Sequence, residues 1–157
     1  MKFRMRLERP QDLKPDVLDG ALRQSIPRIV RIIESYARQN LGGLSKTGRT
    51  LAGLKSRVNV NSKTPRGEVG VFNSNRHHIA RFLETGTRGH GPKRKKYMTF
   101  SIDGKFIRTK FVKGIRATRW LTSAGERALP EAERELQSAV QRVLAAAVTQ
   151  RVKAVNE

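Results

Sequence analysis

The sequence contains no cysteine and few acidic residues: 33 lysines and arginines stand against 13 aspartates and glutamates. The absence of cysteine excludes disulfides and thiolate chemistry. No apolar run approaches the roughly 18 residues that a membrane-spanning helix needs, and residues 1–7 lack the apolar block of a signal peptide. Aromatic residues make up only 6% of the chain, so we expect a mainly aliphatic core.

The shortage of acid leaves a formal net charge of +20. Such an excess makes separate copies repel one another and attracts polyanions. The composition therefore favours a partner that is nucleic acid, an acidic protein surface, or both. At 157 residues the chain has the length of one domain. We expect an N-terminal strand and helix over 1–43, a sheet and loop region over 44–121, and a helical segment over 122–157.

Apolar spacing predicts the elements of the first part of the chain. Phe3, Met5 and Leu7 alternate with charged residues, which is typical of a strand with one buried face. Apolar residues at helical spacing then predict a helix from residue 16 to the glycines at 42 and 43. Because Pro27 interrupts this pattern, we expect either a kinked helix or two short ones. Residues 45–55 have room for one or two further helical turns.

Two strand pairs are predicted next. Alternation around Val58 and Val60 and over residues 68–72, separated by turn residues, indicates an antiparallel pair. The Asp103-Gly104 dipeptide is the strongest hairpin signal in the chain. A two-residue turn gives three cross-strand pairs: Phe100 with Ile107, Met98 with Thr109, and Thr99 with Arg108. We therefore expect a half-buried hairpin with a basic outer face.

A short helix and a long one complete the predicted elements. Residues 76–84 read as a helix with Ile79, Phe82 and Leu83 on one side, capped by Ser74 or Asn75 and ended by Gly86. A helical piece over 122–129 follows, and Pro130 restarts a long helix at its first position. The apolar stripe expected on that helix is Leu136, Val140, Val143, Leu144, Ala147 and Val148. Together the elements predict an α+β fold: a small antiparallel sheet with a hairpin, and an N-terminal helix and a long C-terminal helix packed on it.

Signals of catalysis or cofactor binding are weak. Residues 43–50 copy a phosphate-binding loop with arginine in place of its lysine, but a helix precedes them where a buried strand is required. His77, His78 and His90 lack the spacing and the acidic neighbours of a metal site. Glu84 and Asp103 are isolated carboxylates, whereas a metal-dependent nuclease needs convergent ones. We therefore expect no enzymatic activity, no cofactor and no metal.

The positive charge is concentrated in one stretch. Between Arg88 and Arg119 there are eleven lysines and arginines and one acidic residue, Asp103. This density on a loop over 86–96 and on one hairpin face predicts contact with a polyanion, without sequence selectivity and weakening with salt. Aromatic residues are too sparse for a platform that stacks single-stranded bases. The candidate contact residues are Arg88, Lys93, Arg94, Lys95, Lys96, Lys105, Arg108 and Lys110.

Two short motifs, in this order, resemble those of the tailed-bacteriophage neck proteins, the head-tail joining or tail-completion proteins also called minor tail components. The first motif is matched by Phe82, Leu83, Glu84, Gly86 and Thr87, and the second by Gly114, Ala117, Trp120, Leu121 and Ala124. The family usually has proline where Lys113 stands, and often where Arg119 stands. The resemblance is specific over the second half of the chain and rests on element order alone in the first half.

The resemblance implies a non-enzymatic subunit of a ring, commonly of six copies, between the connector and the tail. Its implied partners are further copies, the connector or stopper, tail-terminator or tail-tube proteins, and the double-stranded DNA that passes through the ring. The protein would be assembled in the host cytoplasm and located in the virion. The basic loop and hairpin would line the lumen or contact acidic neighbours, while the motif residues Phe82, Leu83, Trp120 and Leu121 would pack at the base of the loop. The alternative is a nucleic-acid-binding module that uses the same lysines and arginines.

Overall fold

The computed structural model describes residues 2–3, 15–44, 48–72, 76–93, 96–102 and 104–155. In chain order its elements are β1 (Lys2–Phe3), α1 (Pro15–Gly42), α2 (Arg49–Ala52), β2 (Leu54–Asn59), β3 (Arg66–Val71), α3 (His77–Thr85), β4 (Met98–Ile102), β5 (Lys105–Thr109) and α4 (Trp120–Val155). The predicted α+β fold, with antiparallel strands and two long helices, is confirmed. Met5 and Leu7, on which the first predicted strand partly rested, lie outside the described residues.

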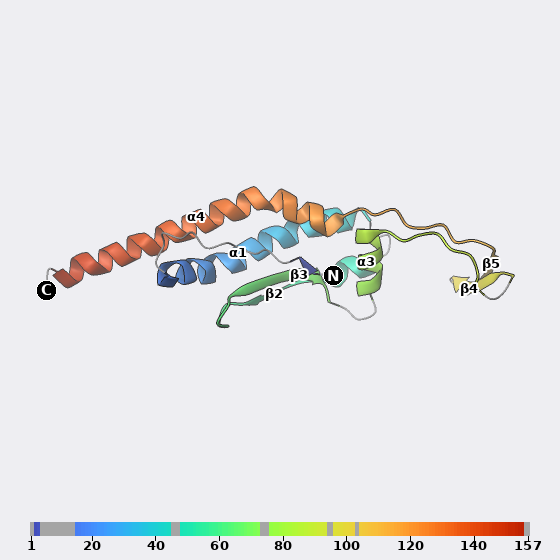
Figure 1. Ribbon diagram of the computed structural model, residues 1–157, viewed down its shortest axis with the longest axis horizontal. Coiled ribbons are helices and arrows are strands. Elements are labelled where there is room, and N and C mark those ends of the chain that lie inside the picture. The colour runs from blue at the N-terminus through green and yellow to red at the C-terminus, as the bar shows by residue number, and fades with distance from the viewer. Residues whose placement is uncertain are drawn as a thin grey trace.

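The two long helices α1 and α4 lie side by side and form the centre of the protein (Figure 1). Helix α4 has 36 residues, which at 1.5 Å per residue gives a length of about 54 Å. Where it packs on α1 it buries alanine at successive turns: Ala124, Ala128 and Ala132. These small side chains leave room for the larger ones of α1, among them Ile29 and Ile33, in one continuous core.

A charged contact also joins the two long helices. The Glu135 carboxylate on α4 accepts hydrogen bonds from Arg28 of α1 and from Arg142, both at 3.0 Å. Partial burial acts to raise the pKa of Glu135, but the bonds from Arg142 and Arg28 outweigh that effect and lower the pKa. No helix in the described ranges is both long enough and apolar enough to span a membrane.

A three-stranded antiparallel sheet in the order β1-β3-β2 packs on α1. Strands β2 and β3 form the predicted antiparallel pair and bury Leu54, Val69 and Val71. Val58 lies on the same face of the pair as the buried Leu54, but its side chain is 42% exposed. Its cross-strand partner Gly67 lies next to Val30 of α1, so this face of the pair is the one turned toward the helix.

The structure decides or corrects three predictions about the helices. Helix α1 continues through Pro27, which excludes two short helices and leaves the other alternative, one helix. Helix α4 likewise begins at Trp120 and continues through Pro130, with no restart there. A proline removes one backbone hydrogen bond, and the packing of a long amphipathic helix outweighs that loss. Leu144, placed in the apolar stripe of α4, is 39% exposed, because α4 packs mainly through the alanines that precede it.

Strands β4 and β5 form a separate two-stranded sheet with the predicted register, in which Phe100 is opposite Ile107. Gly104 in the turn has a φ of 78°, as the two-residue turn requires. The expectation of a half-buried hairpin is wrong. Figure 1 shows the hairpin at the far end of a long extension, away from the helices and from the first sheet.

The close packing of α1 on α4 predicts that Ala128→Leu destabilises the protein by about 1–3 kcal/mol, because the added side chain has no room at a fully buried position. Ala146→Leu, on an exposed position of the same helix, is the matched control and should change the stability by less than about 0.5 kcal/mol. Urea unfolding followed by circular dichroism measures both. Equal midpoints for the two variants would contradict this packing.

Candidate functional site

The most distinctive feature of the structure is an arm, defined here as residues 86–119. It consists of the hairpin β4–β5 and the two segments that connect the hairpin to α3 and α4 (Figure 1). The two segments bond to each other: His90 and Val112 exchange backbone hydrogen bonds of 3.0 and 2.9 Å, and the Thr87 N–H donates to the Ile115 carbonyl at 2.8 Å. The described part of the predicted basic loop is therefore one side of a paired ribbon.

Glu84 organises the base of the arm. Its carboxylate accepts hydrogen bonds from the backbone N–H groups of Leu121 at 2.7 Å and Thr122 at 3.1 Å, and from the Thr122 hydroxyl. The first N–H groups of a helix have no acceptor within the helix, and a negative charge there is favourable toward the helix dipole. Glu84 is only 3% exposed, so a buried carboxylate from α3 caps the beginning of α4.

Trp120 and Leu121 lie in the core beside this cap, 2% and 1% exposed, where the sequence pattern placed them. The Trp120 indole N–H donates to the Ala80 carbonyl of α3 at 3.0 Å, and its backbone carbonyl accepts from the Asn40 amide at 2.9 Å. The end of α1, α3 and the beginning of α4 therefore all meet at Trp120.

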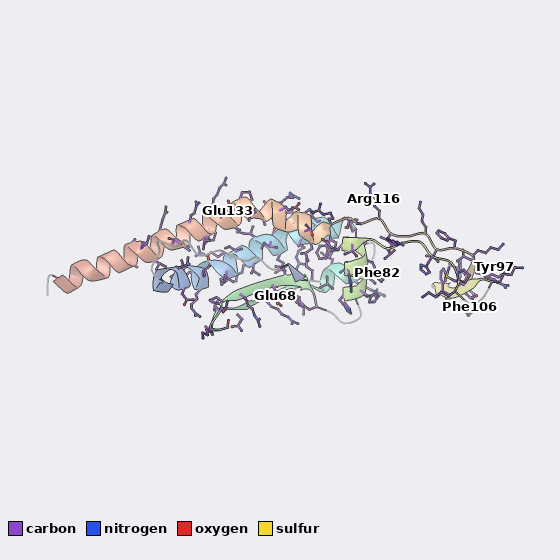
Figure 2. All side chains as sticks on the ribbon, viewed as in Figure 1. Glu68, Phe82, Tyr97, Phe106, Arg116 and Glu133 are labelled. Carbon is purple, nitrogen blue, oxygen red and sulfur yellow. The ribbon has the colours of Figure 1, made fainter. Side chains whose placement is uncertain are left out.

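Phe82 does not pack in the core, contrary to the sequence prediction. Its side chain is 42% exposed, because α3 turns Ala80 and Glu84 inward. Leu83 is partly buried against the core. Phe82 instead lies edge-on to His78 on the outer side of α3, with ring centroids 6.0 Å apart (Figure 2).

Two glycines fit where the segments of the arm come closest. Gly86 ends α3 with a φ of 72°, and a Cβ there would lie 2.7 Å from the Ile115 carbonyl oxygen. A Cβ on Gly114 would collide with the Thr87 carbonyl oxygen. The two sequence motifs, far apart in the chain, thus meet at the base of the arm, and each supplies a glycine that allows the contact.

Positive side chains follow the whole length of the arm. The described candidate residues are all exposed: Arg88, Lys93, Lys96, Lys105, Arg108 and Lys110. Arg94 and Lys95 lie outside the described residues, as does Asp103, the one acidic residue in the arm's sequence. Nearer the base, Arg116 extends outward (Figure 2), and Arg119 forms an ion pair with Glu126 of α4 at 2.9 Å. The arm therefore presents a strongly positive surface.

Three of these cations gather around Tyr97. The Arg108 guanidinium lies 4.2 Å from the ring centroid, and the ammonium groups of Lys110 and Lys96 lie at 5.6 and 6.0 Å. The negative face of the ring offsets part of the repulsion among them. An anionic group placed beside these cations would offset more of their mutual repulsion. This cluster is therefore suited to bind a phosphate or a carboxylate.

The arm also carries exposed apolar side chains, which the sequence reasoning missed because it expected a half-buried hairpin. Phe106 is 84% exposed near the hairpin turn and Phe111 is 60% exposed; Figure 2 shows Phe106 and Tyr97 at the far end of the arm. Ile115, Phe100 and Ile107 are also exposed. Apolar side chains gathered on one exposed feature are typical of an interaction surface.

The other two candidate sites, the loop that resembles a phosphate-binding loop and the three histidines, bring together fewer functional groups than the arm does. Residues 45–47 of the loop that resembles a phosphate-binding loop lie outside the described residues. Arg49 at its end, together with Lys55, Arg57 and Phe72, lines an open hollow of about 340 Å³. His77, His78 and His90 are exposed, and the described residues contain no group of three or more side chains that could hold a metal ion.

Comparison with models of protein families, with curated protein sequences and with solved structures finds no match for this chain. The class of protein is therefore defined by the fold and the arm alone. It is an α+β protein with a helical body and a long arm that ends in a two-stranded hairpin and presents positive and apolar side chains together.

The cap at the base of the arm predicts that Glu84→Ala lowers the free energy of unfolding by about 1.5–3 kcal/mol, because charged hydrogen bonds to the buried beginning of α4 are lost. Glu133→Ala, on an exposed position of α4, is the control. Unfolding in urea can be monitored by the fluorescence of Trp120, the one tryptophan of the sequence. A Glu84→Ala midpoint equal to that of the control would refute the role of this carboxylate.

Proposed function

We propose that this chain is a structural protein of a tailed-bacteriophage neck, a ring subunit that joins the DNA-filled head to the tail. The observation that supports this most is the arm, a hydrogen-bonded ribbon whose positive and apolar side chains find little cover in the chain's own body. A second support is that the two motifs resembling the neck family meet in space, where Glu84, Gly86 and Gly114 form the base of that arm.

In this proposal the protein acts by assembly and catalyses no reaction. A head-to-tail contact between identical subunits closes into a ring when its rotation permits, and we propose a ring of six. Because each subunit carries a formal charge of +20, free copies repel one another. Ring formation therefore requires an anionic template, which the connector or stopper supplies on one side and the tail terminator or tail tube on the other.

The exposed cations of the arm have a further role in this proposal. Arg88, Lys93 and Lys96 are available to double-stranded DNA that passes through the ring. Contacts to phosphate carry no sequence information, which suits a channel that must pass a whole genome. The protein would be assembled in the host cytoplasm and remain in the virion.

Deleting the gene for this chain from its phage should yield DNA-filled heads and free tails that remain separate, visible by electron microscopy. Adding the purified chain to these heads and tails should restore joined particles, because assembly is its only task. The Glu133→Ala chain, changed at an exposed position away from the arm, should restore them equally well. Joined particles at normal frequency without the chain would refute the proposed function.

A nucleic-acid-binding module is the alternative, and the cations around Tyr97 favour it. We expect the free chain to bind a duplex of about 30 base pairs only nonspecifically, with a Kd of roughly 1–100 μM near physiological salt. Gel shifts at about 50 and about 200 mM salt measure this, and the affinity should fall steeply between them. Nanomolar binding at the higher salt, without heads or tails, would favour the alternative.

A further inference from the structure

The β4–β5 hairpin has one apolar face that the described chain leaves uncovered. Side chains of directly paired residues share a face, so Met98 and Phe100 lie on the same side as their partners Thr109 and Ile107. We call Met98, Phe100 and Ile107 the docking face. Phe100 and Ile107 are 37% and 38% exposed, and Figure 1 shows the hairpin apart from every helix and from the sheet β1-β3-β2.

An uncovered face of this kind is unfavourable for an isolated protein. A two-stranded hairpin alone is marginally stable in water and normally gains its stability by packing an apolar face against another element. The alternation of this hairpin is that of half-buried strands, yet no described part of the body covers it. A surface on another molecule would complete the hairpin.

We propose that the docking face packs into an apolar groove on an acidic protein at the head-tail junction, and that carboxylates along the groove pair with the cations of the arm. The location of this partner rests on the proposed function. Its chemistry rests on the arm itself: the exposed Lys105 shares the side of the docking face through its pairing with Ile102, and Arg108 and Lys110 add positive charge on the other side of the same hairpin. Aromatic anchors and arginine surrounded by a polar rim are typical of protein interfaces.

A second copy of this chain is a poor occupant for electrostatic reasons. Each copy is strongly positive, and carboxylates of α4 are already engaged within the chain. Glu126 accepts from Arg119, Glu131 accepts from the Tyr36 hydroxyl, and Glu135 accepts from two arginines. A second copy would therefore bring more positive charge to the arm than available negative charge.

Nucleic acid would neutralise the cations but would not bury the apolar docking face. The phosphate backbone is charged and hydrated, so it offers Phe100 and Ile107 no surface on which to be buried. Phe106 differs, because it lies on the opposite face with Arg108 and is the most exposed large apolar side chain described. An exposed apolar side chain among cations can wedge between base steps. The two faces of the hairpin therefore distinguish a protein partner from DNA.

The test measures cosedimentation of the purified full-length chain with DNA-filled heads and with free tails from the deletion phage. Phe100→Ser combined with Ile107→Ser removes the docking face and should weaken binding to heads or tails by about 100-fold, the size expected when central apolar anchors are lost. Thr99→Ala combined with Ser101→Ala is the control on the opposite face, where both residues are exposed, and should bind as the wild-type chain does. The unfolding midpoint should be unchanged in both variants, because the hairpin lies apart from the body.

A second measurement does not depend on whether the altered hairpin keeps its register. In the wild-type chain the backbone amides of β4 and β5 should exchange with deuterium quickly when the chain is free, and should become protected when heads or tails are added. Equal protection in the free and bound chain would refute the docking face.

The remaining outcomes separate this inference from the proposed function. Wild-type affinity in the double variant would overturn the inference while the neck function stands. An equal loss in the control with Thr99→Ala and Ser101→Ala would overturn the assignment of the docking face. Loss of duplex DNA binding in the double variant, with binding to heads and tails intact, would identify DNA as the occupant. Failure of the wild-type chain to bind either heads or tails would overturn both proposals.

Discussion

The hydrogen bonds that the Glu84 carboxylate accepts from the beginning of α4 hold together the junction on which the rest of the structure depends. Here α3 ends, the arm leaves and returns, and the longest helix begins. A carboxylate placed at unpaired N–H groups satisfies them and also interacts favourably with the helix dipole. Trp120 and the two glycines at the base fit around this contact. The position of the arm relative to the helices follows from it.

The helical body and the arm are stabilised in opposite ways. In the body, α1 and α4 approach closely over a line of alanines, and side chains from both helices and from the first sheet share one core. The arm has no such core, and backbone hydrogen bonds between its two segments hold it together. Its side chains therefore remain available to other molecules. The high positive charge keeps these exposed apolar side chains from drawing copies together at random.

Local signals in the sequence predicted the local structure well. The Asp103-Gly104 turn fixed the hairpin register residue by residue, and Gly86 marked the end of α3. The sequence reasoning failed where distant packing decides, since Pro130 does not restart a helix that a long partner supports. At Pro27 it left two alternatives open, and the structure selects a single helix. It described Glu84 as an isolated carboxylate, because its bonding partners lie almost forty residues away. Alternation along the hairpin indicated burial, but alternation does not show which molecule provides it.

The arm leaves the body at Gly86 and returns next to it, beside Leu83 and Glu84. Since both ends are fixed at neighbouring points, the length of the ribbon is independent of the fold below it. Residues added or removed in matched pairs near the turn would change only how far the tip reaches. The reach of the arm can therefore change between related sequences without any change in the helices.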